Sequence, residues 1–205
     1  MINCGKYTAF LILIVLASKG QAQLVNSYTI DNSPLPFNTV RCLEYSSNTL
    51  WIGTDYGLAK FENETSWTIY NAINSPLWND NIRALKNDGD SLIWIGTVQG
   101  GLFKFDGSEW TNYTPENSGI GDFLVRAIEI DMNGHIWVAT TEGLFVYDRN
   151  IWISWTNNDG LLSNNISSIC AGSDKIYVGS INGGVLYFDT SNNYTNHTII
   201  SSGIP

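Results

Sequence analysis

A fourfold internal repeat constrains the fold of this chain more than any other feature of its sequence. The string Trp-Ile-Gly-Thr begins at Trp51 and at Trp94, and related strings begin at Trp137 and Tyr177, at intervals of 43, 43 and 40 residues. Each copy also has an apolar segment before the string, a glycine-led segment after it and then an aromatic residue. In chain order these are 40–43, 57–61 and Trp67; 82–85, 101–105 and Trp110; 125–128, 143–147 and Trp152; and 166–169, 184–188 and Tyr194. Four features that keep one register through four copies predict a repeat architecture.

Each copy has the pattern of four short strands. In the second copy we expect strands at 81–86, 92–97, 102–105 and 109–114. Asn, Asp and Gly occupy the breaks, and β-branched and aromatic residues fill the strands, which is the chemistry of antiparallel hairpins. No segment has a sustained apolar period of about 3.6 residues. The chain is therefore predicted to be all-β.

A unit of four antiparallel strands in about 42 residues is typical of one blade of a β-propeller. The apolar run 92–95 indicates a strand that is covered on both faces, as happens when blades stack side by side. A β-helix is the alternative, but its coils are usually shorter and lack this four-strand punctuation. We expect four four-stranded antiparallel blades, at about 36–76, 77–119, 120–161 and 162–205.

The repeat resembles a known bacterial family. The order of strand, Asp-rich turn, Trp-Ile-Gly-Thr, Gly-Gly-Leu and Phe-Asp, seen between Ile82 and Asp106, is similar to the two-component regulator propeller repeat. The resemblance covers about 36–200, and the fourth copy departs from it at Tyr177 and Ser180. It implies one of two settings: an exported protein with the repeats ahead of a C-terminal sorting module, or the periplasmic sensor half of a membrane-spanning histidine kinase.

Residues 1–22 are interpreted as a signal peptide. Lys6 supplies the basic start, 8–17 form the apolar stretch, and small residues allow cleavage after Ala22. A membrane anchor is the alternative, but ten apolar residues are too few to span about 30 Å of hydrocarbon. A lipoprotein would need its cysteine just after the apolar stretch, whereas Cys4 precedes it. We expect a secreted, cell-surface or periplasmic chain without a membrane span.

The acidic composition and the few cysteines exclude several classes of function. The chain has a net charge of −9, and removing residues 1–22 leaves eight basic against 19 acidic residues, a net charge of −11. Such a surface repels phosphate backbones and anionic membranes, so nucleic acid is not an expected partner. Cys42 and Cys170 are too few for a disulfide framework, and we expect two buried, reduced thiols.

The sequence contains no catalytic or metal-binding motif, so we expect no enzyme activity, cofactor or metal. Neither His135 nor His197 has the spacing of a zinc site or of a nucleophile's partner. The Asp-rich segments 88–90 and 131–134 could be partial calcium loops, but their place in the repeat favours hairpin turns. The repeated tryptophans could form a sugar-stacking platform, but their recurrence within apolar strands favours core packing.

Three arginines form the candidate binding site. Arg41, Arg83 and Arg126 occupy the same place in the first strand of three copies, where the fourth has Ser167. The first strand of a blade usually borders the central channel, so the three side chains could line one mouth and hold a ligand carboxylate or sulfate. Alternatively, each arginine bonds carbonyls or acids of its own or the next blade.

These observations lead to two hypotheses on function. The first is an exported scaffold that binds a ligand, such as an anionic glycan, or a protein partner. The alternative is a periplasmic sensor domain of a hybrid two-component histidine kinase that detects a glycan fragment.

The blades are expected to form an open arc. Residues 23–35 are a candidate closing strand because 27–30 resemble the fourth-strand text 66–69. However, the last copy already has a fourth strand, at residues 194–200. The sequence of residues 201–205 then resembles that of residues 32–36, which precede the first copy. The rest of the propeller is therefore expected downstream. A closed four-blade ring is the alternative, and it could bring Cys42 and Cys170 within disulfide range.

Overall fold

The structure is a computed structural model that describes residues 12–15, 22–89, 92–189 and 197–199. Four four-stranded antiparallel sheets follow the four repeats, and no α-helix occurs in the described part of the chain. Blades 1 and 2 contain β3 (Val40–Ser46), β4 (Thr49–Thr54), β5 (Gly57–Glu62), β6 (Ser66–Tyr70), β7 (Ile82–Asn87), β8 (Ile93–Thr97), β9 (Leu102–Phe105) and β10 (Trp110–Tyr113). Blades 3 and 4 contain β11 (Ala127–Ile130), β12 (Ile136–Ala139), β13 (Leu144–Tyr147), β14 (Trp152–Trp155), β15 (Ile166–Ala171), β16 (Lys175–Ser180), β17 (Gly184–Asp189) and β18 (His197–Ile199).

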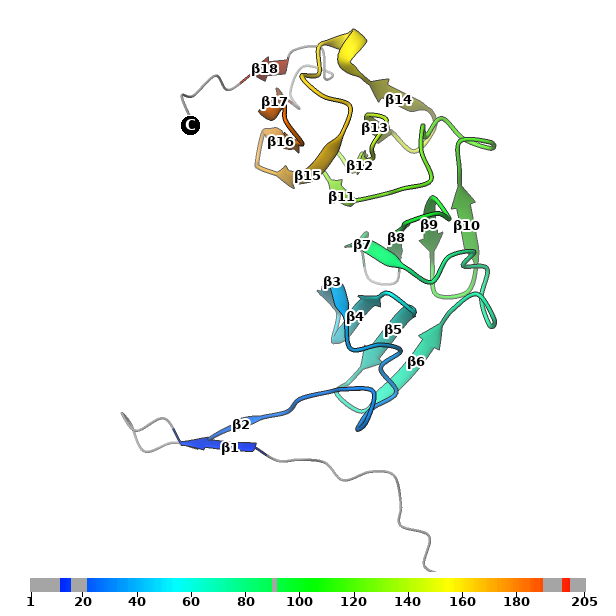
Figure 1. The fold of residues 1–205 in the computed structure, drawn as a ribbon, viewed down its shortest axis with the longest axis vertical. Coiled ribbons are helices and arrows are strands. Elements are labelled where there is room, and N and C mark those ends of the chain that lie inside the picture. Colours follow the sequence, from blue (N-terminus) through cyan, green and yellow to red (C-terminus); the bar gives the residue numbers. More distant parts are fainter. Residues whose placement is uncertain (1–11, 16–21, 90–91, 190–196, 200–205) are drawn as a thin grey trace, which may run out of the picture.

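The four blades fan around a common centre and leave the ring open (Figure 1). The first strands β3, β7, β11 and β15 lie along the concave side of the arc, and β6, β10 and β14 lie along its convex side. Blades 1 and 4 occupy opposite ends of the arc. The prediction of an all-β, open part of a propeller is therefore confirmed.

The hydrophobic core is divided among the joints between neighbouring blades. One cluster joins blades 1 and 2 around Trp51, a second joins blades 2 and 3 around Trp94, and a third joins blades 3 and 4 around Trp137. A fourth, smaller cluster lies on the free face of blade 1 around Ile52. Because most of the apolar surface faces a neighbouring blade, stacking is the main source of hydrophobic stabilisation.

The third and fourth residues of the repeated string, Gly and Thr, each have an identifiable structural role. A Cβ atom added at Gly96 would lie 2.5 Å from Cγ1 of Val125 in the next blade, so glycine permits the close approach of blades. The hydroxyl of Thr97 donates to the carbonyl of Gly101 at 3.0 Å, and Gly101 has a φ of 80° that favours glycine. The string therefore combines a blade contact with the turn between the second and third strands.

The repeat predicts that Tyr177, like the three equivalent tryptophans, is largely buried, but the fourth copy of the string is only partly buried. Tyr177 pairs with Tyr187 in the same register in which Trp94 pairs with Lys104, so the two positions are equivalent. Trp94 is 1% exposed and Tyr177 is 40% exposed. The physical reason is that each tryptophan is covered by the following blade, and among the described residues no blade follows blade 4.

The segment that leads into blade 1 has a different register from the one expected. The expected strand at 27–30 is not formed, since the nearest strand is β2 (Ala22–Val25), which pairs with β1 (Ile12–Val15). Tyr28 contacts Phe61 and Trp67, as Tyr70 contacts Phe105 and Trp110. Tyr28 is thus equivalent to Tyr70 at the end of a fourth strand, and not to Trp67.

The turn that follows each of these tyrosines supports the corrected register. The backbone N–H of Thr29 donates to the side chain of Asn32 at 2.7 Å, and that of Asn71 donates to Asn74 at 2.9 Å. The hydroxyl of Ser33 then bonds the carbonyl of Thr29 at 2.7 Å. The corresponding hydroxyl of Ser75 repeats this bond to Asn71 at the same length. The connection between blades is therefore also a repeated unit.

Three further expectations concern the ends of the chain and the cysteines. The predicted signal peptide falls mostly outside the described residues, and cleavage after Ala22 stays a prediction. Tyr194 also lies outside them; in the described part of the fourth strand, His197 pairs with Phe188 at the place where Trp152 pairs with Tyr147. Both cysteines are free, but Cys170 is exposed because it lies on the uncovered face of blade 4 beside Tyr177.

Candidate functional site

The three arginines lie on the concave side of the arc, where the first strands begin. The β3–β4 pairing shifts register between Val40 and Cys42, and the β7–β8 pairing shifts between Ile82 and Ala84. Arg41 and Arg83 therefore occupy bulge positions, and a bulge redirects the side chain that it carries. Arg126 directly precedes β11 and donates its backbone N–H to the carbonyl of Ala139 at 2.9 Å.

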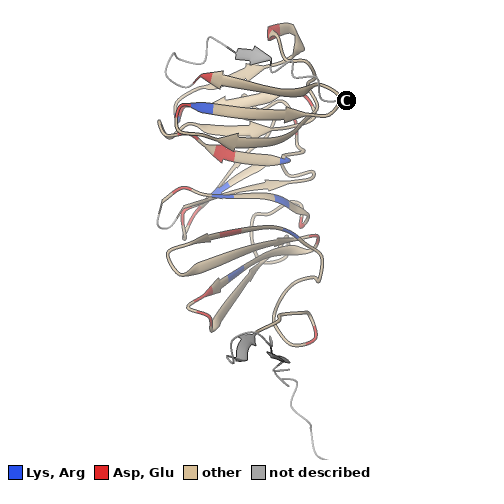
Figure 2. Cartoon of the chain, turned by 90° about the vertical axis from the view of Figure 1, so that its left-hand side faces the viewer, with Lys and Arg blue, Asp and Glu red and all other residues tan. Residues whose placement is uncertain are grey.

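The structure brings the three side chains around one cavity. This arginine cavity has a volume of about 530 Å³ and is lined by Arg41, Arg83, Val98, Leu124 and Arg126. Seen from the open side of the arc, charged positions of either sign are sparse along the blades (Figure 2). The cavity thus gathers three of the four arginines of an acidic chain.

Arg41 is paired within its own blade. Its guanidinium makes two hydrogen bonds to Asp55 in the β4–β5 turn, at 2.7 Å and 2.8 Å. These bonds are the largest reason that the pKa of Asp55 lies below its usual range, and the charge of Arg83 acts in the same direction. The bidentate pair holds Arg41 at the rim of the cavity.

Arg126 is paired across a joint. Its Nη1 donates to the side-chain oxygen of Asn165 and, at 3.4 Å, to the carbonyl of Ile166, both in the segment that begins blade 4. Both acceptors are neutral, so the positive charge of Arg126 is not cancelled by them. In blade 4, Ser167 stands at the arginine position and donates its hydroxyl to the carbonyl of Gly179 at 3.1 Å.

Arg83 lies between the other two arginines, and it has neither an acidic hydrogen-bond partner like that of Arg41 nor neutral ones like those of Arg126. Its side chain is half-buried, and none of the described residues accepts a hydrogen bond from it. Its charge acts on Asp55 and on the Cys42 thiol, whose pKa is raised to about 12 by burial. The alternative in which every arginine bonds its own or the next blade thus describes Arg41 and Arg126, but not Arg83.

The Asp-rich hairpins are turns, as their place in the repeat indicates. Asp131 accepts the backbone N–H groups of Asn133 and His135, each at 2.9 Å, and the indole N–H of Trp137 at 3.0 Å. Asp88 likewise accepts the indole N–H of Trp94 at 3.0 Å. Within the described ranges, no group of three His, Cys, Asp or Glu residues is placed to hold a metal ion.

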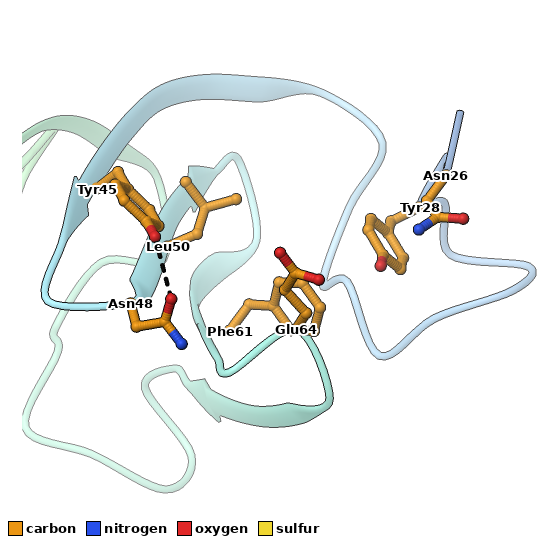
Figure 3. A pocket seen from close by; sticks show the side chains of 7 residues that line it. All are labelled: Asn26, Tyr28, Tyr45, Asn48, Leu50, Phe61 and Glu64. Atoms are coloured by element: carbon orange, nitrogen blue, oxygen red, sulfur yellow. Dashed lines mark hydrogen bonds between the residues drawn. The ribbon is translucent and has the colours of Figure 1, made fainter. Parts of the chain in front are cut away.

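A second cavity, which sequence reasoning missed, lies on the free face of blade 1. This aromatic cavity has a volume of about 260 Å³ and is lined by Asn26, Tyr28, Tyr45, Asn48, Leu50, Phe61 and Glu64 (Figure 3). Tyr45 and Leu50 lie on one side of it and Tyr28 on the other. Aligning the text 28–35 with 70–77, where both carry Asn, Ser, Pro and Leu at the same places, could have revealed it.

Comparison with known proteins shows the fold. No protein-family model and no curated protein matches the chain. The extracellular domain of the hybrid two-component system BT3049 from B. thetaiotaomicron matches with 20% identity and a TM-score of 0.66, over 80% of this chain and 25% of that one. The extracellular domain of the one-component system BT4673 from the same organism matches with 20% identity and a TM-score of 0.72, over 91% and 27%.

An enzyme has the same architecture. A catalytically inactive virginiamycin B lyase from Staphylococcus aureus matches with 12% identity and a TM-score of 0.63, over 92% of this chain and 62% of that one. This chain therefore spans about a quarter of the length of the two-component neighbours and less than two thirds of the lyase. No helix in the described ranges is long and apolar enough to cross a membrane.

Proposed function

We propose that this chain is a non-catalytic binding module of an exported bacterial protein, and that the arginine cavity holds an anionic ligand. Arg83 is the observation that carries the proposal. Its half-buried guanidinium lines the cavity, and no described residue accepts a hydrogen bond from it. A partly desolvated charge is costly unless it is paired. A ligand carboxylate or sulfate would supply the missing acceptor and could bind an arginine through two parallel hydrogen bonds.

The surroundings of Arg83 suit an extended ligand with more than one anionic group, such as an acidic glycan. Arg126 flanks Arg83 on the next blade with a charge that its neutral partners leave uncancelled, whereas Arg41 already pairs with Asp55. An acidic segment of a protein partner has the same chemistry and is the second candidate. Catalysis is not part of the proposal; the side chain of His135 contacts Asp131 within a hairpin turn at 3.0 Å.

The alternative is a periplasmic sensor domain of a hybrid two-component histidine kinase. The BT3049 neighbour is the extracellular domain of a hybrid two-component system and the BT4673 neighbour that of a one-component system, and both favour a sensor. The sensor would use the same cavity to detect a glycan fragment. Export and cleavage after Ala22 are part of both versions of the proposal.

Calorimetric titration with acidic oligosaccharides tests the proposal. The probes are a uronic-acid tetrasaccharide, a sulfated one and a neutral one of equal length. We expect the wild-type chain to bind at least one of the two acidic probes. Arg83→Gln should weaken that binding by roughly tenfold or more, because one charged hydrogen-bonding group is lost.

Arg149→Gln is the matched control. Arg149 is the fourth arginine of the chain, lies outside the arginine cavity and already bonds Asp88 at 2.9 Å. This variant should bind the acidic probe as the wild type does. Equal binding by the Arg83→Gln variant, or binding of the neutral probe as tight as that of the acidic ones, would contradict the proposal.

A further inference from the structure

At the interior joints, the second-strand tryptophan of one blade meets an aromatic residue of the next. The ring of Trp51 lies 6.2 Å from that of Phe105 in blade 2, and Tyr70, at the end of β6, lies 5.3 Å from the same ring. At the next joint, the ring of Trp94 lies 6.3 Å from that of Tyr147, and Tyr113 lies 5.7 Å from it. Each joint thus has two aromatic residues from one blade that meet the third-strand aromatic of the next.

The free face of blade 1 has this arrangement with one member absent. Phe61 is the third-strand aromatic, and Tyr28 lies 5.2 Å from it in the place of Tyr70 and Tyr113. The aromatic cavity beside Tyr28 and Phe61 is therefore where the second-strand ring of a preceding blade would lie. Leu43 on the same face is 58% exposed, whereas its equivalent Leu85 at an interior joint is 7% exposed.

The free face of blade 4 has the complementary half. Tyr177, in the register of Trp51 and Trp94, is not covered by a following blade among the described residues. Val185 is 40% exposed, and its equivalent Leu102 is fully buried. Blade 4 therefore presents a second-strand ring and an apolar third strand, which are what the aromatic cavity lacks.

We propose that a second copy of this chain docks its blade 4 on the free face of blade 1. Tyr177 of that copy enters the aromatic cavity, where Asn48 and Glu64 offer acceptors for its hydroxyl. Two copies joined in this way at both ends would close one ring of eight blades, within the range of about 4–8 that propellers use. Each free face would then become an interior joint.

The register of Tyr28 adds a condition to this docking. At interior joints the residue equivalent to Tyr28 pairs with the third strand of its own blade, as Tyr70 pairs with Leu58. In blade 4 that partner is Val185, and the neighbouring Leu186 is already paired with Ile199 of β18. Tyr28 of one copy and β18 of the other therefore compete for the same edge of β17. Docking displaces β18, the shortest fourth strand of the four.

Shortening the chain after Asp189 tests this proposal. Removing β18 leaves the edge of β17 free, so we expect the shortened chain to dimerise roughly tenfold or more tightly than the full chain in sedimentation velocity. Within the shortened chain, Tyr28→Ala or Tyr177→Ala should abolish the dimer. Trp78→Ala is the matched control, because Trp78 is an exposed aromatic outside both faces and should leave the dimer unchanged.

Mixing the two variants distinguishes the proposed contact from nonspecific association. Tyr28→Ala damages only the accepting face and Tyr177→Ala only the entering face, so an equimolar mixture retains one intact joint and should form a weaker heterodimer. The same variants in the full chain give an independent comparison, should removal of β18 disturb blade 4. A shortened chain that stays monomeric at every soluble concentration, or a dimer that survives Tyr177→Ala, would overturn the proposal.

Discussion

The joints inside the arc and the two faces at its ends have the same residue pattern in different surroundings. Trp94 lies inside a joint, where its ring is covered by blade 3 and its indole N–H bonds Asp88. Tyr177 has the same register in blade 4 and is 40% exposed. The difference teaches that burial in this fold is decided by the neighbouring blade and not by the strand that carries the residue.

Replacing the second-strand aromatic should have the largest effect, and only at an interior position. Trp94→Ala should lower the free energy of unfolding by about 3–5 kcal/mol, because it opens a cavity in a packed joint. Tyr177→Ala should change it by less than about 0.5 kcal/mol in dilute protein, because its ring is exposed. Urea unfolding measures both, and equal losses at the two positions would contradict the comparison.

Adding a methyl group to the repeated glycine should have a smaller effect with the same contrast. A Cβ at Gly96 meets Val125 of the next blade at 2.5 Å, so Gly96→Ala should cost about 1–3 kcal/mol through overpacking. A Cβ at Gly179 meets the hydroxyl oxygen of Ser168 in its own blade, which can rotate away. Gly179→Ala should therefore leave the unfolding midpoint nearly unchanged, and a larger shift at Gly179 than at Gly96 would break the comparison.

The strands could be located well from the sequence because their residue pattern is repeated. The four strands expected in the second copy match β7 to β10 to within one residue at each boundary, and the common place of the arginines anticipated one shared cavity. Hairpin turns and apolar runs are local signals, so a single copy already contains most of the information about its own sheet.

The features of the site that could not be predicted depend on residues outside the repeated sequence. Asp55 pairs with Arg41, but the equivalent positions in blades 2 and 3 are Val98 and Thr141, so no pattern announced the pairing. The equivalence of Tyr28 to Tyr70 was missed because the segment 27–30 also resembles the segment 66–69, which matches Tyr28 with Trp67, three residues earlier. Only ring contacts and the turn bonds of Asn32 and Asn74 distinguish them.

The reactivity of the two cysteines tests most directly whether the end faces are half-made joints. Cys170 lies opposite Tyr177 on the free face of blade 4, whereas Cys42 is packed at the joint with blade 2 and has a pKa raised to about 12 by burial. Thiol labelling is measured in the chain shortened after Asp189 with Cys4→Ser. We predict fast labelling of Cys170 in dilute protein, a rate that falls as concentration rises, and slow labelling of Cys42 throughout. A Cys170 rate that does not depend on concentration, or a Cys42 rate as fast as that of Cys170, would contradict the account.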